Sequence, residues 1–482
     1  MTVAVTGIDR YITDAPLRMP FSFGNVTVTQ QPHLFVRVAI DTPAGTATGL
    51  AADGLSPLWF VKEASFRDGF DAMLAVIDHA CEVAAHVHPM ESSFEVWRAI
   101  YERQQTWGEA SPHPPLLWSY GVSLIERALI DAICRSHGLP FHEALATNTF
   151  DIDLGYFHPE LACNSPTSYL PGTPADRVAV RHTVGLTDPL VAEDLTVDNR
   201  VDDGLPQTLC EHIETHEVEH FKLKIGGQPE QDVARLRRIG AVLSASPLDS
   251  YRITLDANEQ YDSAAAFRTF WERMEGISEL DTLCERIDFV EQPLPRNEAL
   301  GSETERVLDD WDDRPALIID ESDDRIDSCA RALACGYDGT SHKNVKGVFK
   351  GIANACRIRQ LQASEEGQYV LSCEDAANIG PVALPQDLAV VACLGVGHVE
   401  RNGHQFFRGL SMFPKAIQSG ILEAHPDLYE RHPDGFATVS IDEGDLLLDT
   451  ANGAPFGYAI EFDPAQFTPL SEWSLTLSTT HD

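Results

Sequence analysis

Between residues 219 and 375 the chain repeats one pattern, a short apolar run that ends in a charged residue. The first run, residues 220–227, alternates as a strand does and places Lys222 and Lys224 on one face. At successive steps of 32, 35, 29, 23 and 31 residues from Lys224, later runs end in Asp256, Glu291, Asp320, Lys343 and Glu374. A step of this length accommodates one strand, one helix and two loops. The pattern therefore predicts a βα repeat and a parallel sheet.

The segments between these runs have the character of helices. In Pro229–Ser246 the apolar positions recur at helical spacing, and the proline suits a first helical turn. Ala264–Ile277 and Lys346–Ala363 are similar in length. A (β/α)8 barrel carries its chemistry at the carboxyl ends of its strands, whereas an open doubly wound sheet would need a ligand loop, and the sequence has no glycine-rich phosphate loop. We therefore expect an α/β protein built on a (β/α)8-type barrel.

The charged strand ends predict a metal site. Burying two lysines side by side costs several kcal/mol unless anions face them. A lone acid after a strand is more often a turn or cap residue, but three follow consecutive runs, at Asp256, Glu291 and Asp320. These carboxylates would converge at the barrel mouth, where a cation or a proton must relieve their repulsion. An all-oxygen site suits Mg²⁺ or Mn²⁺ rather than zinc.

The first 150 residues follow a different pattern. Residues 34–50 read as a hairpin of an antiparallel sheet, and residues 60–87, 93–105 and 119–136 read as helices. We expect an α+β domain over residues 1–150 and a linker or insertion over residues 151–175, which is rich in proline and glycine.

Composition and charge limit the partners and the location. The chain of 482 residues has a net charge of −39, a field that repels nucleic acid and anionic membranes. No uninterrupted apolar run is long enough to span a bilayer, and the ten cysteines are scattered singly, so we expect a soluble cytoplasmic protein with reduced thiols. The acid-rich, lysine-poor composition fits a protein of a salt-accumulating organism and an ordinary acidic enzyme equally well. Three of the seven lysines stand at predicted strand ends.

A group of histidines has the spacing of a helix face. His212, His216 and His220 lie four residues apart, with Glu214 between the first two. A zinc helix needs its glutamate directly after the first histidine. The sequence therefore favours a solvated helix face over a metal site.

The order of the strand-end motifs resembles that of the enolase superfamily, specifically its muconate lactonizing enzyme-like subgroup within the mandelate racemase/muconate lactonizing enzyme family. The motifs, in chain order, are Lys222-x-Lys224, Asp256-Ala257-Asn258, Glu291-Gln292-Pro293, Asp320-Glu321-Ser322 and Lys343. The resemblance covers nearly the whole chain.

The resemblance also implies a domain arrangement. Pro20-Phe21 lies where the family has a mobile specificity loop, and residues 128–140 resemble its long helix and the following turn. The tail around Gly453–Ile460 resembles the segment that returns to the family's capping domain. The resemblance therefore implies an N-terminal α+β capping domain, a barrel over residues 176–405, and a C-terminal segment, residues 406–482, that completes the cap.

The mechanism implied by the resemblance uses Asp256, Glu291 and Asp320 as Mg²⁺ ligands, with the metal holding a substrate carboxylate and stabilising an enediolate. Lys224 and Lys343 would face each other across the substrate as acid and base, and Lys222 would stay protonated. Three further residues are expected to support the ligands or to contact the substrate or Lys343: Asn258, Glu321 and Glu374. The expected partner is a small carboxylate, and the protein is expected to be a homo-oligomer.

Departures from the family leave the reaction open among racemisation, epimerisation, cycloisomerisation and syn-elimination. Residues 399–402 lack the Asp-x-Asp pair of dipeptide epimerases, and Cys373-Glu374-Asp375 replaces the histidine of a His-Asp dyad. Lys346 competes with Lys343 for the role of the sixth-strand lysine, but Lys343 ends the strand. Specificity would depend on cap loops at residues 20–26 and 51–58. The alternatives are a carboxylate-based barrel glycoside hydrolase, which leaves the lysines unexplained, and a non-catalytic barrel with a binding role.

Overall fold

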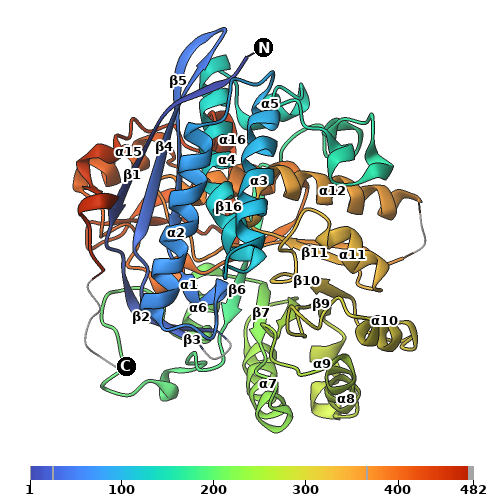
Figure 1. Ribbon diagram of the computed structural model, residues 1–482. Coiled ribbons are helices and arrows are strands. Elements are labelled where there is room, and N and C mark those ends of the chain that lie inside the picture. Colours follow the sequence, from blue (N-terminus) through green and yellow to red (C-terminus); the bar gives the residue numbers. More distant parts are fainter. Residues whose placement is uncertain (1, 24–25, 365–366, 476–482) are drawn as a thin grey trace.

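Eight parallel strands form a closed barrel in the computed structural model, which describes residues 2–23, 26–364 and 367–475 (Figure 1). The strands, in chain order, are β6 (Arg177–Val184), β7 (His220–Lys224), β8 (Arg252–Asp256), β9 (Ile287–Glu291), β10 (Leu317–Ile319), β11 (Gly339–His342), β12 (Val370–Cys373) and β13 (His398–Arg401). Each strand pairs in parallel with the next, and β13 pairs with β6, which closes the ring. The predicted βα barrel is confirmed.

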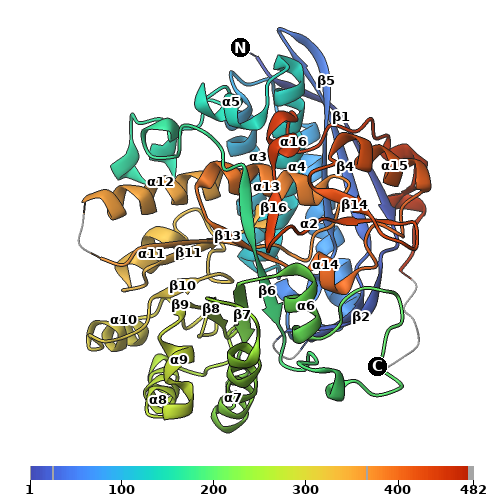
Figure 2. The same cartoon turned by 180° about the vertical axis from the view of Figure 1, so that it is seen from behind.

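Helices connect the strands on the outside of the barrel (Figure 2). The connecting helices are α6 (Leu209–His216), α7 (Pro229–Ala245), α8 (Ala264–Glu275), α10 (Ser302–Asp309), α11 (Ser328–Ala334), α12 (Val348–Ser364) and α13 (Ala383–Leu394). The predicted helices of residues 229–246, 264–277 and 346–363 correspond to α7, α8 and α12. Each has an apolar face buried against the strands, as the sequence periodicity requires.

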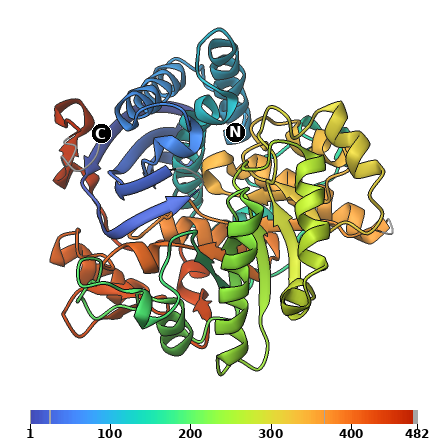
Figure 3. The ribbon, with the colours of Figure 1, turned by 90° about the horizontal axis from the view of Figure 1, so that it is seen from below.

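An antiparallel sheet and three long helices form the cap, which lies beside the barrel (Figure 3). The sheet has the order β17-β1-β4-β5, and its elements are β1 (Ala4–Thr13), β4 (His33–Thr42), β5 (Gly45–Gly54) and the C-terminal β17 (Thr468–Pro469). The helices are α2 (Phe66–Ala85), α3 (Ser93–Glu109) and α4 (Pro115–His137). A separate ribbon pairs β2 (Pro16–Phe23) with β3 (Val26–Gln30). The predicted hairpin of residues 34–50 corresponds to β4 and β5.

Helix α4 joins the cap to the barrel. Every side chain from Leu116 to Cys134 is buried, so this helix is enclosed on all sides. It packs closely against β5 on one side, and Glu126 accepts a hydrogen bond of 2.6 Å from the backbone N–H of Phe349, at the start of α12, on the other. The position of the cap over the barrel is therefore fixed by a buried helix.

The C-terminal segment returns to the cap, as the resemblance implied. Strand β17 pairs with β1, and the hydroxyl of Tyr458 donates to Asp131 of α4 at 2.7 Å. The same segment also adds β16 (Asp445–Leu447) antiparallel to β6, so it is attached to the barrel as well. Among the described residues, no helix has the length and apolar character needed to cross a membrane.

The contact between β5 and α4 can be tested at Gly49. A Cβ at this position would overlap the backbone O of Ala128 and the backbone N of Ala132. Gly49→Ala should therefore lower the free energy of unfolding in urea by about 2 kcal/mol or more. Gly453→Ala, at the end of α16 (Asp449–Gly453), meets no atom within 4 Å and serves as the matched control, with a change within about 0.5 kcal/mol. Equal unfolding midpoints for the two variants would contradict this packing.

Candidate active site

The centre of the barrel mouth is the ammonium group of Lys222. Its Nζ lies within 3.0 Å of one oxygen of each of four carboxylates: Asp256 at 3.0 Å, Glu291 at 2.7 Å, Glu374 at 2.9 Å and Glu400 at 2.8 Å. All five side chains are buried, none more than 3% exposed. A buried ion pair is stable only when its partners are close and well satisfied. One lysine thus holds four barrel strands together at their carboxyl ends.

The register of the parallel strands explains this convergence. Lys224 is paired with Asp256, and Asp256 with Glu291, at the last residues of β7, β8 and β9. Asp320 directly follows β10, and Glu374 directly follows β12. Parallel strands in register bring residues at their carboxyl ends to one edge of the barrel. The structure therefore brings together side chains that are up to 178 residues apart in the sequence, as Lys222 and Glu400 are.

Asp320 is held by two lysines. Its carboxylate accepts hydrogen bonds from Lys343 at 2.7 Å, from Lys346 at 2.9 Å and from the Ser341 hydroxyl at 2.6 Å. Lys346 also donates to the Ser341 carbonyl at 2.6 Å, which fixes it within the barrel wall. Lys343 instead reaches the cavity described below, with its Nζ 4.8 Å from the centre of the Trp59 ring. This placement favours Lys343 over Lys346 as the lysine that meets a substrate.

Lys224 has a different set of partners. Its Nζ contacts Asp256 and donates to the Asn258 side-chain oxygen at 2.7 Å. Asn258 in turn donates to Glu321 at 3.1 Å. The predicted supporting roles of Asn258 and Glu321 fit these contacts, since together they orient Lys224 and Asp256.

Burial and charge shift the pKa values within this cluster. Burial alone would lower the pKa of Lys222, but the carboxylates around it outweigh burial and raise its pKa well above the ordinary value. Burial likewise opposes ionisation of Glu374, yet Lys222 and Lys343 bring its pKa down to about 2. Asp320 is shifted in the same direction, because Lys343 and Lys346 hold its pKa well below the usual range despite burial. These groups are therefore charged at neutral pH.

Glu291 is the exception. Burial, together with the nearby charges of Asp256 and Glu374, raises the pKa of Glu291 well above its ordinary value. Its Oε2 lies 2.7 Å from the Lys222 ammonium in a geometry that forms no hydrogen bond, and its Oε1 has no hydrogen-bond partner in the described part of the chain. A bound cation would satisfy the unpartnered Oε1 and favour the ionised form of this carboxyl.

The oxygens fit a hard cation. Glu291, Asp320 and Glu374 each offer one oxygen within 4.8 Å of the others. Asp256 is not among these three. Lys222 and Lys224 both contact its Oδ2, and its Oδ1 accepts a hydrogen bond from the backbone N–H of Asn258 at 2.8 Å. The ligand set Asp256, Glu291 and Asp320 stays a prediction, and Glu374 is a further candidate ligand.

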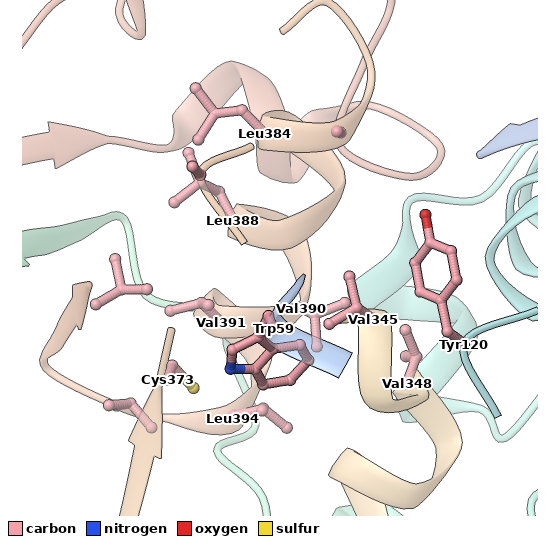
Figure 4. Close-up of a cluster of buried hydrophobic side chains, with 14 of the residues drawn as sticks. Trp59, Tyr120, Val345, Val348, Cys373, Leu384, Leu388, Val390, Val391 and Leu394 are labelled. Atoms are coloured by element: carbon pink, nitrogen blue, oxygen red, sulfur yellow. The ribbon is translucent and has the colours of Figure 1, made fainter. Parts of the chain in front are cut away.

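A cavity that opens to solvent lies between this cluster and the cap. Its polar end includes Lys224, Lys343, Asn258, Glu400, Asn402 and Asp375. Its apolar walls include Leu17, Phe21, Val28, Trp59, Phe60, Tyr120 and Val345, most of them from the cap. Figure 4 shows Trp59, Tyr120 and Val345 among buried hydrophobic side chains. The predicted cap loops contribute Phe21, Gly54 and Ser56, whereas residues 24–25 of the first loop lie outside the described residues.

Two charged residues that contact Lys222 or its carboxylate partners were not predicted from the sequence. Glu400 binds Lys222 and accepts a hydrogen bond from the Thr183 hydroxyl at 2.6 Å. Arg181, in the middle of β6, donates to Glu374 at 2.9 Å. Glu400 ends an apolar run as the other acids do, so its position was a usable signal. Arg181 stands within a strand and carries no such signal.

The fold is that of solved structures named for mandelate racemase and muconate lactonizing enzymes. A mandelate racemase/muconate lactonizing protein of Herpetosiphon aurantiacus matches with 18% identity, a TM-score of 0.59, and coverage of 95% of this chain and 99% of that one. The muconate lactonizing enzyme of Pseudomonas fluorescens, in complex with muconolactone, matches with 19% identity, 95% and 97% coverage and a TM-score of 0.59. The N-succinyl Arg/Lys racemase of Bacillus cereus matches with 16% identity, 94% and 98% coverage and a TM-score of 0.55.

Sequence comparison adds nothing to this likeness. No protein-family model matches the chain, and no curated protein matches it either. At these identities the structural likeness establishes the fold, while the chemistry must be argued from the site.

Removing the central ammonium tests the electrostatics of the cluster. Lys222→Met leaves four buried carboxylates facing one another, so it should lower the free energy of unfolding of the metal-free protein at pH 7 by about 3–5 kcal/mol. Lys415→Met, at the exposed start of α15 (Lys415–Ala424), should change it by less than about 0.5 kcal/mol.

The amount by which Lys222→Met lowers the free energy of unfolding should depend on pH. In the wild type, a carboxyl with a lowered pKa, such as Glu374 at about 2, contributes stability that is present above the unfolded value of about 4.3 and is lost as the pH falls toward 2. The difference between wild type and variant should therefore be full at pH 7 and shrink below pH ~4. A deficit that stays constant down to pH ~2 would show that lost packing, not charge, is responsible.

Proposed function

We propose that the chain is a member of the enolase superfamily, of the mandelate racemase/muconate lactonizing enzyme type, and that it abstracts the proton α to a carboxylate with the help of Mg²⁺. The observation that carries the proposal is the pair Lys224 and Lys343, which reach one cavity directly beside a buried carboxylate cluster. A carbon acid of this kind needs a base at the α-carbon and positive charge at the carboxylate. The site offers both.

The cluster supports a Mg²⁺ site. Glu291 and Asp320 are common to the predicted ligand set and to the three carboxylates that lie within 4.8 Å of one another, so we propose them as ligands, with Asp256 or Glu374 as the third. Mn²⁺ would suit the same oxygens. When bound, the cation supplies the charge that makes an enediolate accessible. Solved structures with this fold contain Mg²⁺, including a dipeptide epimerase of Enterococcus faecalis in complex with Mg²⁺ and a dipeptide.

The two lysines would then move protons at the α-carbon. Burial favours the neutral amine of Lys343, whereas Asp320 and Glu374 favour its ammonium form and raise its pKa well above the ordinary value. If Lys343 loses either carboxylate partner, its pKa falls, and the neutral amine that can act as a base becomes more populated. Lys224 reaches the same cavity and would serve as the acid or base on the other side of the substrate. Lys222, buried among four carboxylates, stays protonated and supplies fixed positive charge.

The cavity walls support a substrate class. A substrate whose carboxylate lies near the cluster would place its other end against Phe21, Trp59 and Tyr120. These walls offer apolar contact and little to pair with a charged group. We therefore propose a carboxylate with an apolar side group, converted by racemisation, epimerisation, cycloisomerisation or syn-elimination.

Hydrogen exchange at the α-carbon tests this proposal directly. The full chain with Mg²⁺ in D₂O should incorporate deuterium, measured by ¹H NMR, into α-substituted carboxylates with apolar side groups faster than into those with charged ones. Lys224→Ala and Lys343→Ala should each lower the rate by about 10²-fold or more, because each removes a proton-transfer group. Lys415→Ala, far from the site, should leave it unchanged.

Two outcomes would overturn the proposal. Exchange that persists undiminished in both lysine variants would exclude the two-lysine mechanism. Absence of exchange across the carboxylates, with release of sugar from glycosides, would indicate the barrel hydrolase instead.

A further inference from the structure

Three buried histidines meet on the outer side of the barrel wall. His182 lies on β6, His212 on α6, and His404 on α14 (Gly403–Phe406), which directly follows β13. His182 and His212 are at most 2% exposed. His404 as a whole residue has intermediate exposure, but the groups around it bury its ring. Along β6 the neighbours Arg181 and Thr183 bind Glu374 and Glu400 inside the barrel. Because successive side chains of a strand point to opposite faces, His182 points away from the carboxylate cluster.

This burial corrects the prediction from the sequence. His212 was expected on a solvated helix face, but its side chain is fully buried. The spacing of His212 and His216 gave no reason to add His182 and His404, which reach the cluster from other elements. Only the fold brings the members of this histidine cluster together.

The geometry of the three rings fits a metal ion. Their ring nitrogens include one from each residue that all lie within 4.8 Å of one another. His182 Nδ1 and His404 Nε2 are 3.1 Å apart, close to the separation of about 3.3 Å between two nitrogens on one tetrahedral zinc ion. The His212 ring centre is 4.3 Å from that of His182 and 5.3 Å from that of His404. Small side-chain rotations would bring all three nitrogens into coordination distance.

Nδ1 of His182 and Nε2 of His404 are within hydrogen-bond distance of each other, but three other ring nitrogens of the cluster lack partners. Neither ring nitrogen of His212 has a hydrogen-bond partner in the described part of the chain, and Nδ1 of His404 has none. An unsatisfied buried polar atom costs about 1–3 kcal/mol. Burial also lowers the pKa of His182 to about 3 and that of His212 well below its usual value, so the imidazoles are neutral, the form that binds metal. A ligand that accepts nitrogen lone pairs would satisfy them.

We infer that His182, His212 and His404 form a second metal site, distinct from the carboxylate cluster, which takes Zn²⁺ or a similar transition-metal ion. Imidazole nitrogens suit such ions, whereas Mg²⁺ prefers oxygen ligands. His216 is not one of these three, but its ring centre lies 5.6 Å from that of His212 and 5.8 Å from that of His404, so it is the candidate for a fourth ligand. This inference stands independently of the proposed function.

The position of the site indicates a structural role. Arg18 of β2 donates to the Gln405 carbonyl at 2.9 Å and to the Pro206 carbonyl at 3.0 Å, so it contacts α14 and the segment before α6. Phe21 of the same strand packs on Phe406, with ring centres 4.3 Å apart. A metal joining β6, α6 and α14 would brace the elements on which β2 rests, and with them one wall of the cavity.

Cobalt distinguishes the two kinds of site. The metal-free full chain, with Mg²⁺ in excess to fill the oxygen site, should bind one equivalent of Co²⁺ with the intense visible absorption of a nitrogen-rich, four-coordinate ion, and Zn²⁺ should displace it. His212→Asn and His404→Asn should weaken this binding by at least tenfold. His220→Asn, a half-buried histidine stacked on His398 outside the cluster, should retain it. All three variants should still bind Mg²⁺ in calorimetry, which separates this site from the proposed catalytic one.

A measurement on the unsubstituted protein covers variants that fail to fold. X-ray absorption at the zinc edge of the Zn²⁺-loaded wild type should show scattering from at least three imidazoles. A shell of oxygen ligands, or the absence of the Co²⁺ band from folded wild type, would overturn the inference. A Co²⁺ band that is unchanged in both His212→Asn and His404→Asn would also overturn the inference.

Discussion

The ammonium of Lys222 is the interaction on which the barrel mouth depends. Burying four carboxylates side by side would be strongly unfavourable without a cation among them, because the effective desolvation penalty is several kcal/mol per ion. Lys222 contacts all four and lies on the first of the motif-bearing strands, β7. Lys343 and Lys346 form the corresponding buried ion pairs with Asp320. Of seven lysines in a chain with a net charge of −39, five are buried and neutralise acids near the barrel mouth.

The cap supplies most of the apolar walls of the cavity beside this charged centre. The buried helix α4 fixes the cap to the barrel, and Trp59, from the short helix α1 (Pro57–Phe60), lies over Lys343. In the proposed function the reacting groups come from barrel strand ends and most of the apolar walls from the cap. A division of this kind lets one barrel chemistry serve many substrates, because loops change more easily than strand ends.

The sequence predicted the parts of this structure that depend on local pattern. The βα spacing, the acids at strand ends and the family resemblance indicated the barrel, its cap and the convergence of Lys222, Asp256 and Glu291. Long-range placement could not be predicted. Arg181 lies mid-strand, and its contact with Glu374 exists only because β13 closes the ring onto β6. The histidine cluster is a further example, since three elements from distant parts of the sequence supply it and the spacing along α6 alone indicated a solvated face.

The proposed function requires the carboxylate cluster to bind a divalent cation through Glu291. Calorimetric titration of the metal-free full chain with Mg²⁺ tests it most directly, alongside Glu291→Gln and the exposed control Glu275→Gln. We expect one binding site in the wild type and in Glu275→Gln, and its loss in Glu291→Gln, since that change removes a negative charge and a ligand oxygen. Absence of specific binding in the folded wild type, or equal binding by Glu291→Gln, would contradict it.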